Sequence, residues 1–147
     1  MAEDKYAQIR LDNQLCFPLY ACSRKIVQQY TPLLDELGIT YTQYLTLMVL
    51  WEEGEATVGE LTKKLYLDTG TMTPLLKKMQ TKGLITRERS KEDERSVIIK
   101  LTSEGEALKE KAVSIPGHMV QCLNLSKEEF EILYKALYRL LDNLKQK

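Results

Sequence analysis

The residues best suited to chemistry are a cysteine near the amino end, Cys16, and the tyrosines that follow it. Cysteine reacts as its thiolate, and a phenol hydroxyl that donates a hydrogen bond to the sulfur stabilises that form. Such a thiolate can attack the O–O bond of a peroxide. Tyr30 comes fourteen residues after Cys16, roughly 21 Å along a helix axis, so the two cannot touch within one helix. A second, antiparallel copy of the helix could bring them together.

The residues around Cys16 have the spacing of a helix from about Gln8 to Tyr30. Apolar and small residues recur every three or four positions in two neighbouring stripes, which are Leu15, Leu19, Cys22 and Ile26, and Cys16, Tyr20, Ser23, Val27 and Tyr30. On such a stripe a cysteine could also be no more than a small buried hydrophobe. Pro18 predicts a kink beside Cys16, and Thr31-Pro32 predicts the end of the helix.

Residues 57–102 are organised as two short helices, a glycine stop and two strands. Asp68, Thr69 or Thr71 can cap the second helix, and Gly83 ends it. The strands, 84–87 and 97–101, flank a tip that is too polar to be buried. This order predicts a winged helix-turn-helix, in which the second helix enters the major groove of DNA and the wing reaches the minor groove.

The charge of this segment supports nucleic-acid binding over a merely solvated face. Residues 57–102 hold ten Lys or Arg and six acidic residues, a net charge of +4, whereas the whole chain is neutral and the remainder is therefore −4. We expect DNA contacts from one face of the second helix and from the wing. The residues are Thr69, Thr71, Thr73, Lys77, Lys78, Arg87, Lys91, Asp93 and Arg95.

The two ends of the chain predict apolar helical faces. Thr40 or Thr42 can cap a helix that runs to about Glu53, and Ser126 opens a capping box before a leucine-rich terminal helix. Such stripes are buried most simply against a two-fold mate. We therefore expect a mainly α fold with a small β-wing and one structural domain, divided into dimerisation helix and turn (1–40), reader (41–102) and dimerisation helices (103–147).

The amino-acid composition limits which other classes of protein the chain could belong to. The chain has 147 residues, of which 44% are apolar, and no secretory or membrane-spanning run, so we expect a soluble cytoplasmic protein. Three cysteines without close pairing argue against a disulfide framework, and no pattern of zinc ligands is present. We expect neither a metal nor a cofactor.

The wing carries a family resemblance. Asp93-Glu94-Arg95, followed by a strand and Leu101-Thr102, resembles the wing signature of the MarR family of bacterial transcription regulators. The resemblance implies that Arg95 enters the minor groove and that Asp93 holds its guanidinium.

The amino-terminal pattern resembles one subgroup, the organic hydroperoxide resistance regulators. Asn13-Gln14-Leu15-Cys16-Phe17, with tyrosines downstream, is similar to their sensor segment. The resemblance implies a homodimeric repressor on a pseudo-palindromic operator, released when organic hydroperoxide oxidises Cys16. It also implies that Tyr30 and Tyr41 of the second subunit, with Tyr20 nearby, stabilise the thiolate.

What reacts next with oxidised Cys16 stays open. Cys22 lies six residues on, about 9 Å along a helix and off its face, which excludes a disulfide within the helix. We prefer Cys122 as the resolving residue, because two-cysteine members of the subgroup keep one in the carboxy-terminal region. Otherwise a low-molecular-weight thiol caps the sulfur.

Two other functions compete with this prediction. One is a MarR-type regulator released by a phenolic small molecule or answering general oxidative stress. The other is a thiol peroxidase, but the P-x-x-x-[TS]-x-x-C pattern of the peroxiredoxins is missing from the sequence. We therefore do not expect an enzyme.

Overall fold

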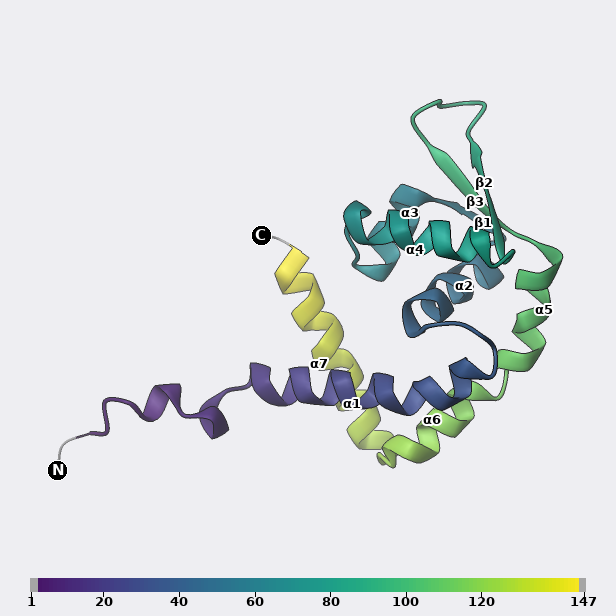
Figure 1. The fold of residues 1–147 in the computed structure, drawn as a ribbon. Coiled ribbons are helices and arrows are strands. Elements are labelled where there is room, and N and C mark those ends of the chain that lie inside the picture. Colours follow the sequence, from purple (N-terminus) through teal and green to yellow (C-terminus); the bar gives the residue numbers. More distant parts are fainter. Residues whose placement is uncertain (1–2, 146–147) are drawn as a thin grey trace. The chain divides into compact units, whose positions relative to one another are not determined.

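The computed structural model describes residues 3–145 and separates into two compact units, Met1–Val113 and Ser114–Lys147. Figure 1 shows the fold, whose elements are helices apart from one small sheet. Among the described residues, no helix has both the length and the apolar composition needed to cross a membrane.

The first long helix, α1 (Cys16–Asp35), begins later than predicted. The preceding residues form two 3₁₀ turns, Ala7–Ile9 and Leu11–Asn13. Side-chain amides of Asn13 and Gln14 donate to backbone carbonyls of the first turn and of Arg10, at 2.6–2.8 Å. These bonds replace the helical ones and hold the segment out of the helix. Pro18 is then the third residue of α1, where no helical N–H bond is lost, so it causes no interior kink.

The far end of α1 also differs from the prediction, because the helix continues through Thr31-Pro32 to Asp35. Proline removes one hydrogen bond, whereas Leu34, only 1% exposed, fixes the last turn in the core. Gly38 (φ 70°) then reverses the chain in the left-handed region. The residues from Pro32 to Asp35 are therefore the last turn of α1.

The next helix, α2 (Tyr41–Glu53), starts from a complete capping box made by Thr40 and Gln43. Gly54 (φ 84°) ends it as predicted. A three-residue strand, β1 (Glu55–Thr57), follows and was not predicted. It exists through its antiparallel pairing with a strand more than forty residues later in sequence, a contact that local pattern cannot reveal.

The predicted helix pair is confirmed as α3 (Val58–Leu65) and α4 (Thr69–Thr81). Asp68 is the cap of α4, because its Oδ1 atom accepts the Thr71 N–H at 2.7 Å. This hydrogen bond also lowers the pKa of the Asp68 carboxyl. The apolar face of α4 is buried through Met72, Leu75, Leu76 and Met79.

The wing consists of β2 (Ile85–Arg89) and β3 (Val97–Leu101), two strands of a sheet ordered β1-β3-β2. Ile85 pairs with Leu101 and Arg89 with Val97, so β2 extends two residues beyond the predicted strand. Figure 1 shows the hairpin projecting beyond the helices of its unit. The winged helix-turn-helix prediction is confirmed, with Leu47, Leu61, Leu76 and Ile99 fully buried in its core.

The helix after the wing, α5 (Ser103–Ala112), lies against the strands at Gly105. Thr102 caps α5 and also donates to the Gly83 carbonyl at 2.5 Å. The Trp51 indole donates to the Gly105 carbonyl at 3.0 Å. A Cβ atom on Gly105 would lie 2.2 Å from the Leu84 carbonyl oxygen. Only glycine therefore fits this contact without backbone movement.

Gly105→Ala is expected to lower the free energy of unfolding by about 1–3 kcal/mol, the usual cost of overpacking a core. Urea titrations followed by circular dichroism, at one fixed protein concentration, measure this change. Gly59→Ala is the matched control, since its nearest non-local atom is 3.9 Å away, and it should be neutral or stabilising by about 0.5–1 kcal/mol. Equal effects for the two variants would show that the Leu84 contact is not restrictive.

The second unit holds α6 (Ile115–Leu123) and α7 (Lys127–Lys145). Pro116 stands in the first turn of α6, where its missing N–H costs no helical hydrogen bond. The predicted capping box of Ser126 and Glu129 is confirmed by reciprocal hydrogen bonds of 2.8 and 3.1 Å.

Candidate functional site

Three tyrosines meet where α1 ends and α2 begins. The ring centroids of Tyr30 and Tyr41 are 4.8 Å apart, and Tyr44 lies 5.8 and 6.4 Å from them. The structure therefore brings together two residues predicted to act on the sensor sulfur, within one protomer. Tyr44 was not predicted as a site residue, and at 3% exposure it belongs to the core. Its place three residues after Tyr41 was the signal for the third ring.

The cluster keeps its phenols protonated. Burial, followed by the neighbouring Tyr41 and Tyr44 hydroxyls, raises the pKa of Tyr30 to about 12. Burial also raises the pKa of Tyr41, and burial followed by Tyr41 raises that of Tyr44. A phenol that holds its proton remains a hydrogen-bond donor. These groups are therefore suited to stabilising an anion.

Cys16 is the first residue of α1 and is exposed. Because α1 runs without a break from Cys16 past Tyr30, the two side chains are separated by roughly 21 Å of helix. Within one protomer, α1 thus separates the Cys16 thiol from Tyr30 and from the two α2 tyrosines that contact it. Tyr20, 62% exposed, lies apart from the tyrosine cluster, with the Arg24 guanidinium 5.5 Å from its ring centroid.

The other cysteines are also free and exposed. Cys22 belongs to α1, while Cys122 belongs to α6 in the second unit. Exposure makes both thiols accessible for exchange. Which of them reacts with Cys16, if either, stays a prediction.

The predicted DNA-contacting residues of α4 lie on its outer face. Thr69, Thr71, Lys77 and Lys78 are exposed and Thr73 is half-buried, whereas the opposite side of the helix enters the core. Two lysines and three hydroxyls on one helix face can donate to phosphates and base edges.

The wing presents Lys91, Asp93 and Arg95 in its exposed tip. The Asp93 carboxylate accepts the backbone N–H of Arg95 at 3.0 Å and the Ser96 hydroxyl at 3.4 Å. Among the described residues these are the donors that bond the Asp93 carboxylate, and its bond to the Arg95 guanidinium stays a prediction. Asp93 shapes the turn that carries Arg95.

Arg87 occupies the middle of β2, opposite Ile99. It is half-buried, and its Nε atom is buried without a hydrogen-bond partner among the described residues. A buried donor left unpaired is costly, so a partner from outside the protomer would stabilise this side chain.

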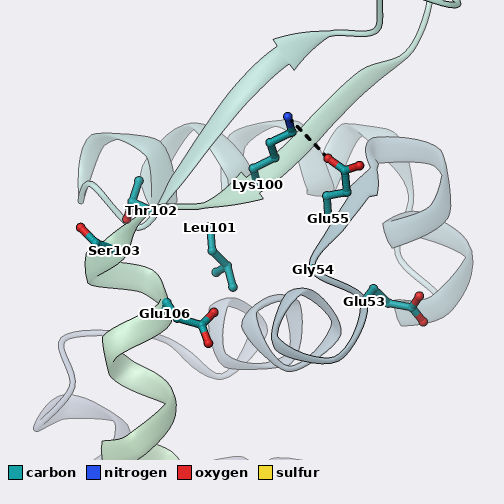
Figure 2. Close-up of a pocket in the computed structure, with 8 residues that line it drawn as sticks. All are labelled: Glu53, Gly54, Glu55, Lys100, Leu101, Thr102, Ser103 and Glu106. Atoms are coloured by element: carbon teal, nitrogen blue, oxygen red, sulfur yellow. Dashed lines mark ion pairs between the residues drawn. The ribbon is translucent and has the colours of Figure 1, made fainter.

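A polar pocket opens beside the base of the wing (Figure 2). Lys100 pairs with Glu55 at 3.6 Å and with Glu88 at 3.5 Å. Glu53 pairs with Lys64. The Lys100 pairs link β3 to β1 and β2, the Glu53–Lys64 pair links α2 to α3, and no residue predicted for the site lines the pocket. Within residues 3–145, no group of three His, Cys, Asp or Glu side chains could hold a metal ion.

Comparison with known proteins adds the family. Residues 28–112 match the family model described as transcriptional regulator SarA/Rot. The chain is 55% identical to the organic hydroperoxide resistance transcriptional regulator of Bacillus subtilis strain 168, over 99% of both chains.

Solved structures agree with this assignment. Reduced AbfR bound to DNA, a protein of Staphylococcus epidermidis, is 37% identical with a TM-score of 0.77, over 95% of this chain and 98% of that one. A mutant MarR from Escherichia coli in complex with operator DNA is 27% identical with a TM-score of 0.81, over 95% and 99%. The chain therefore belongs to the MarR family of transcription regulators, in the group of the organic hydroperoxide resistance regulators.

Proposed function

We propose that the protein is a homodimeric DNA-binding repressor that leaves its operator when organic hydroperoxide oxidises Cys16. One observation carries the proposal: a single unbroken helix, α1, has an exposed Cys16 at its first position and Tyr30 near its other end, where the Tyr30 ring contacts Tyr41 of α2. Two antiparallel copies of α1 would place each thiol beside the phenols of its partner. The sensor is therefore complete only between protomers.

The chemistry of the sensor needs only the thiolate and the oxidant. The Cys16 thiolate attacks one oxygen of the hydroperoxide, an S–O bond forms, the O–O bond breaks, and the alcohol leaves with one added proton. Cysteine is oxidised to sulfenic acid while the peroxide is reduced. A second thiol, from Cys122, Cys22 or a low-molecular-weight thiol, then condenses with the sulfenic acid, forming a disulfide and releasing water.

The uncovered apolar surface supports a dimer. No residue of α7 is buried, and its apolar stripe is exposed through Phe130, Leu133, Leu137, Leu140 and Leu144. At the other end of the chain, Leu15 is 74% exposed. Apolar patches of this extent are normally covered by a partner. A second copy of the same helices would bury them and would pair two reader heads for a pseudo-palindromic site.

The reader proposal uses α4 and the wing. The outer face of α4 would enter the major groove, and Arg95 would enter the adjacent minor groove. Arg87 on β2 is half-buried, and the exposed part of its guanidinium could reach a phosphate beside the wing. The relatives whose structures are named as DNA complexes have the same fold over nearly the whole chain.

The test is an operator-binding assay with the DNA upstream of the protein's own coding sequence. Reduced protein should bind, cumene hydroperoxide should release it, and a thiol reductant should restore binding if the oxidised form is a disulfide. Release by a phenol such as salicylate, with no response to the hydroperoxide, would instead support regulation by a small ligand. Repeated turnover of peroxide with a reductant would indicate an enzyme.

Arg95→Ala is expected to weaken operator binding by about 1–3 kcal/mol and to lower the slope of log K against log salt by about one. Fluorescence anisotropy at several salt concentrations measures both quantities. Lys109→Ala, which removes one exposed charge from α5, is the matched control and should change neither. If the two variants bind alike, Arg95 does not contact the DNA.

A further inference from the structure

Lys82 joins the end of the reader helix to the corner that holds the sensor tyrosines. It is the carboxy-terminal cap residue of α4. Its ammonium donates to the Gly38 carbonyl at 2.7 Å and to Oε1 of Gln43 at 2.9 Å. Within residues 3–145, these two bonds are the side-chain hydrogen bonds between this end of α4 and the α1–α2 corner. We call this set of contacts the Lys82 clamp.

The acceptors of the clamp are rigidly held. Gln43 is 2% exposed, and the same Oε1 atom also accepts the Thr40 N–H at 3.1 Å. The Gln43 N–H donates in turn to the Thr40 hydroxyl at 3.3 Å. Gly38 is fixed by its own N–H, which donates to the Asp35 carbonyl at 3.0 Å. The Lys82 ammonium thus donates to two acceptors, the Gly38 carbonyl and Gln43 Oε1, that move only when the backbone of the corner moves.

The clamp lies directly beside the sensor. Tyr41 is the first residue of α2, directly after the cap residue Thr40, and its ring centroid lies 4.8 Å from that of Tyr30. A displacement of Tyr41 shifts Thr40, its neighbour in the chain, and the capping box passes the shift to Gln43. Lys82 must then either lose its acceptors or move with them.

Resting on the proposed function, we infer that the Lys82 clamp couples oxidation at the sensor to the position of α4. Oxidation of Cys16 of the partner subunit displaces Tyr30 and Tyr41, and the clamp carries this displacement to the carboxy-terminal end of α4. The reader helix then leaves its register on the DNA. Lys82 is a positioning residue, and it contacts neither the oxidant nor the DNA.

The inference is tested by the ratio of two dissociation constants for the operator, oxidised over reduced, which expresses the coupling between the sites. In Lys82→Met the reduced protein should bind within about threefold of wild type, while the ratio falls by about tenfold or more, within the range of typical couplings. Lys82→Arg, which keeps a cation able to reach two acceptors, should retain most of the ratio. Lys109→Met controls for loss of one exposed lysine.

Gln43→Met removes one acceptor from the other side and leaves the protein's charge unchanged. Like Lys82→Met, it should lower the ratio of the oxidised to the reduced dissociation constant, and it should not alter the salt dependence of binding. Thermal unfolding of every variant shows whether each is folded at the assay temperature. If Gln43→Met is unfolded at the assay temperature, the comparison of Lys82→Met with Lys82→Arg decides whether the clamp couples the sensor to α4.

Several results would overturn the inference. A lower melting temperature with an unchanged ratio would make the clamp a stabilising contact only. Weaker binding of reduced Lys82→Met, with a lower salt slope and an unchanged ratio, would make Lys82 a phosphate contact. A wild-type ratio near one would refute the proposed function, and the coupling with it. If the wild-type ratio is large and Lys82→Met has the same ratio, only the role of the clamp is refuted.

Discussion

Cys16→Ser is expected to bind the operator equally well before and after hydroperoxide treatment, whereas wild type should lose about 10- to 100-fold in affinity, as typical allosteric couplings do. A hydroxyl has the size of the thiol but forms no sulfenic acid and no disulfide. Reduced binding should therefore stay near the wild-type level. Anisotropy titrations of both proteins, with and without cumene hydroperoxide, measure the difference.

The other two thiols supply the controls. Cys22→Ser and Cys122→Ser should both still form sulfenic acid at Cys16, because neither residue is the site of attack. If Cys122 resolves the sulfenic acid, its loss should abolish the subsequent protein disulfide, seen on a non-reducing gel. A Cys16→Ser protein that is still released by hydroperoxide would place the sensor at another residue.

Tyr30→Phe/Tyr41→Phe is expected to slow oxidation of Cys16 by about tenfold or more. A hydrogen bond to a charged group contributes about 1.5–3 kcal/mol, and two such bonds to the thiolate would be lost. The raised pKa of Tyr30, about 12, keeps its hydroxyl a donor throughout the neutral range. Trapping of the sulfenic acid with dimedone, followed by mass spectrometry over time, gives the rate.

Tyr44→Phe is the matched control for the double variant. Tyr44 belongs to the same cluster, with its ring centroid 5.8 Å from that of Tyr30, but at 3% exposure it is not accessible to a second protomer. Its variant should therefore react at nearly the wild-type rate. Equal slowing in both variants would mean that the rings act through packing rather than through their hydroxyls.

Much of the reader could be predicted because its signals are local. Asp68, Gly83 and Thr102 act within one turn of the chain, as caps or as a residue with positive φ. The pairing of β2 with β3 follows from strand composition on either side of a polar tip. In contrast, β1 exists only through a distant partner, and α1 passes Pro32 because Leu34 is buried.

The candidate site was predictable only in part for the same reason. Cys16, Tyr30 and Tyr41 were indicated by residue type and by family resemblance, and the structure joins the two tyrosines. The role of Asp93 towards the Arg95 guanidinium stays a prediction, whereas its two hydrogen bonds within the wing turn were not predicted. The contacts of Lys82 could not be predicted from the sequence, since both of its acceptors lie about forty residues away along the chain.

Mixed dimers that contain a single Cys16 test most directly whether the phenols act across the dimer. Both protomers carry Cys22→Ser and Cys122→Ser, so that Cys16 is the one thiol that can react. In the first mixture, Cys16→Ser with intact tyrosines pairs with a Tyr30→Phe/Tyr41→Phe protomer that retains Cys16. In the second mixture, a protomer with Cys16→Ser, Tyr30→Phe and Tyr41→Phe pairs with a protomer that retains Cys16 and both tyrosines. We predict fast dimedone trapping in the first mixture and slow trapping in the second, and the reverse order would contradict a sensor shared between protomers.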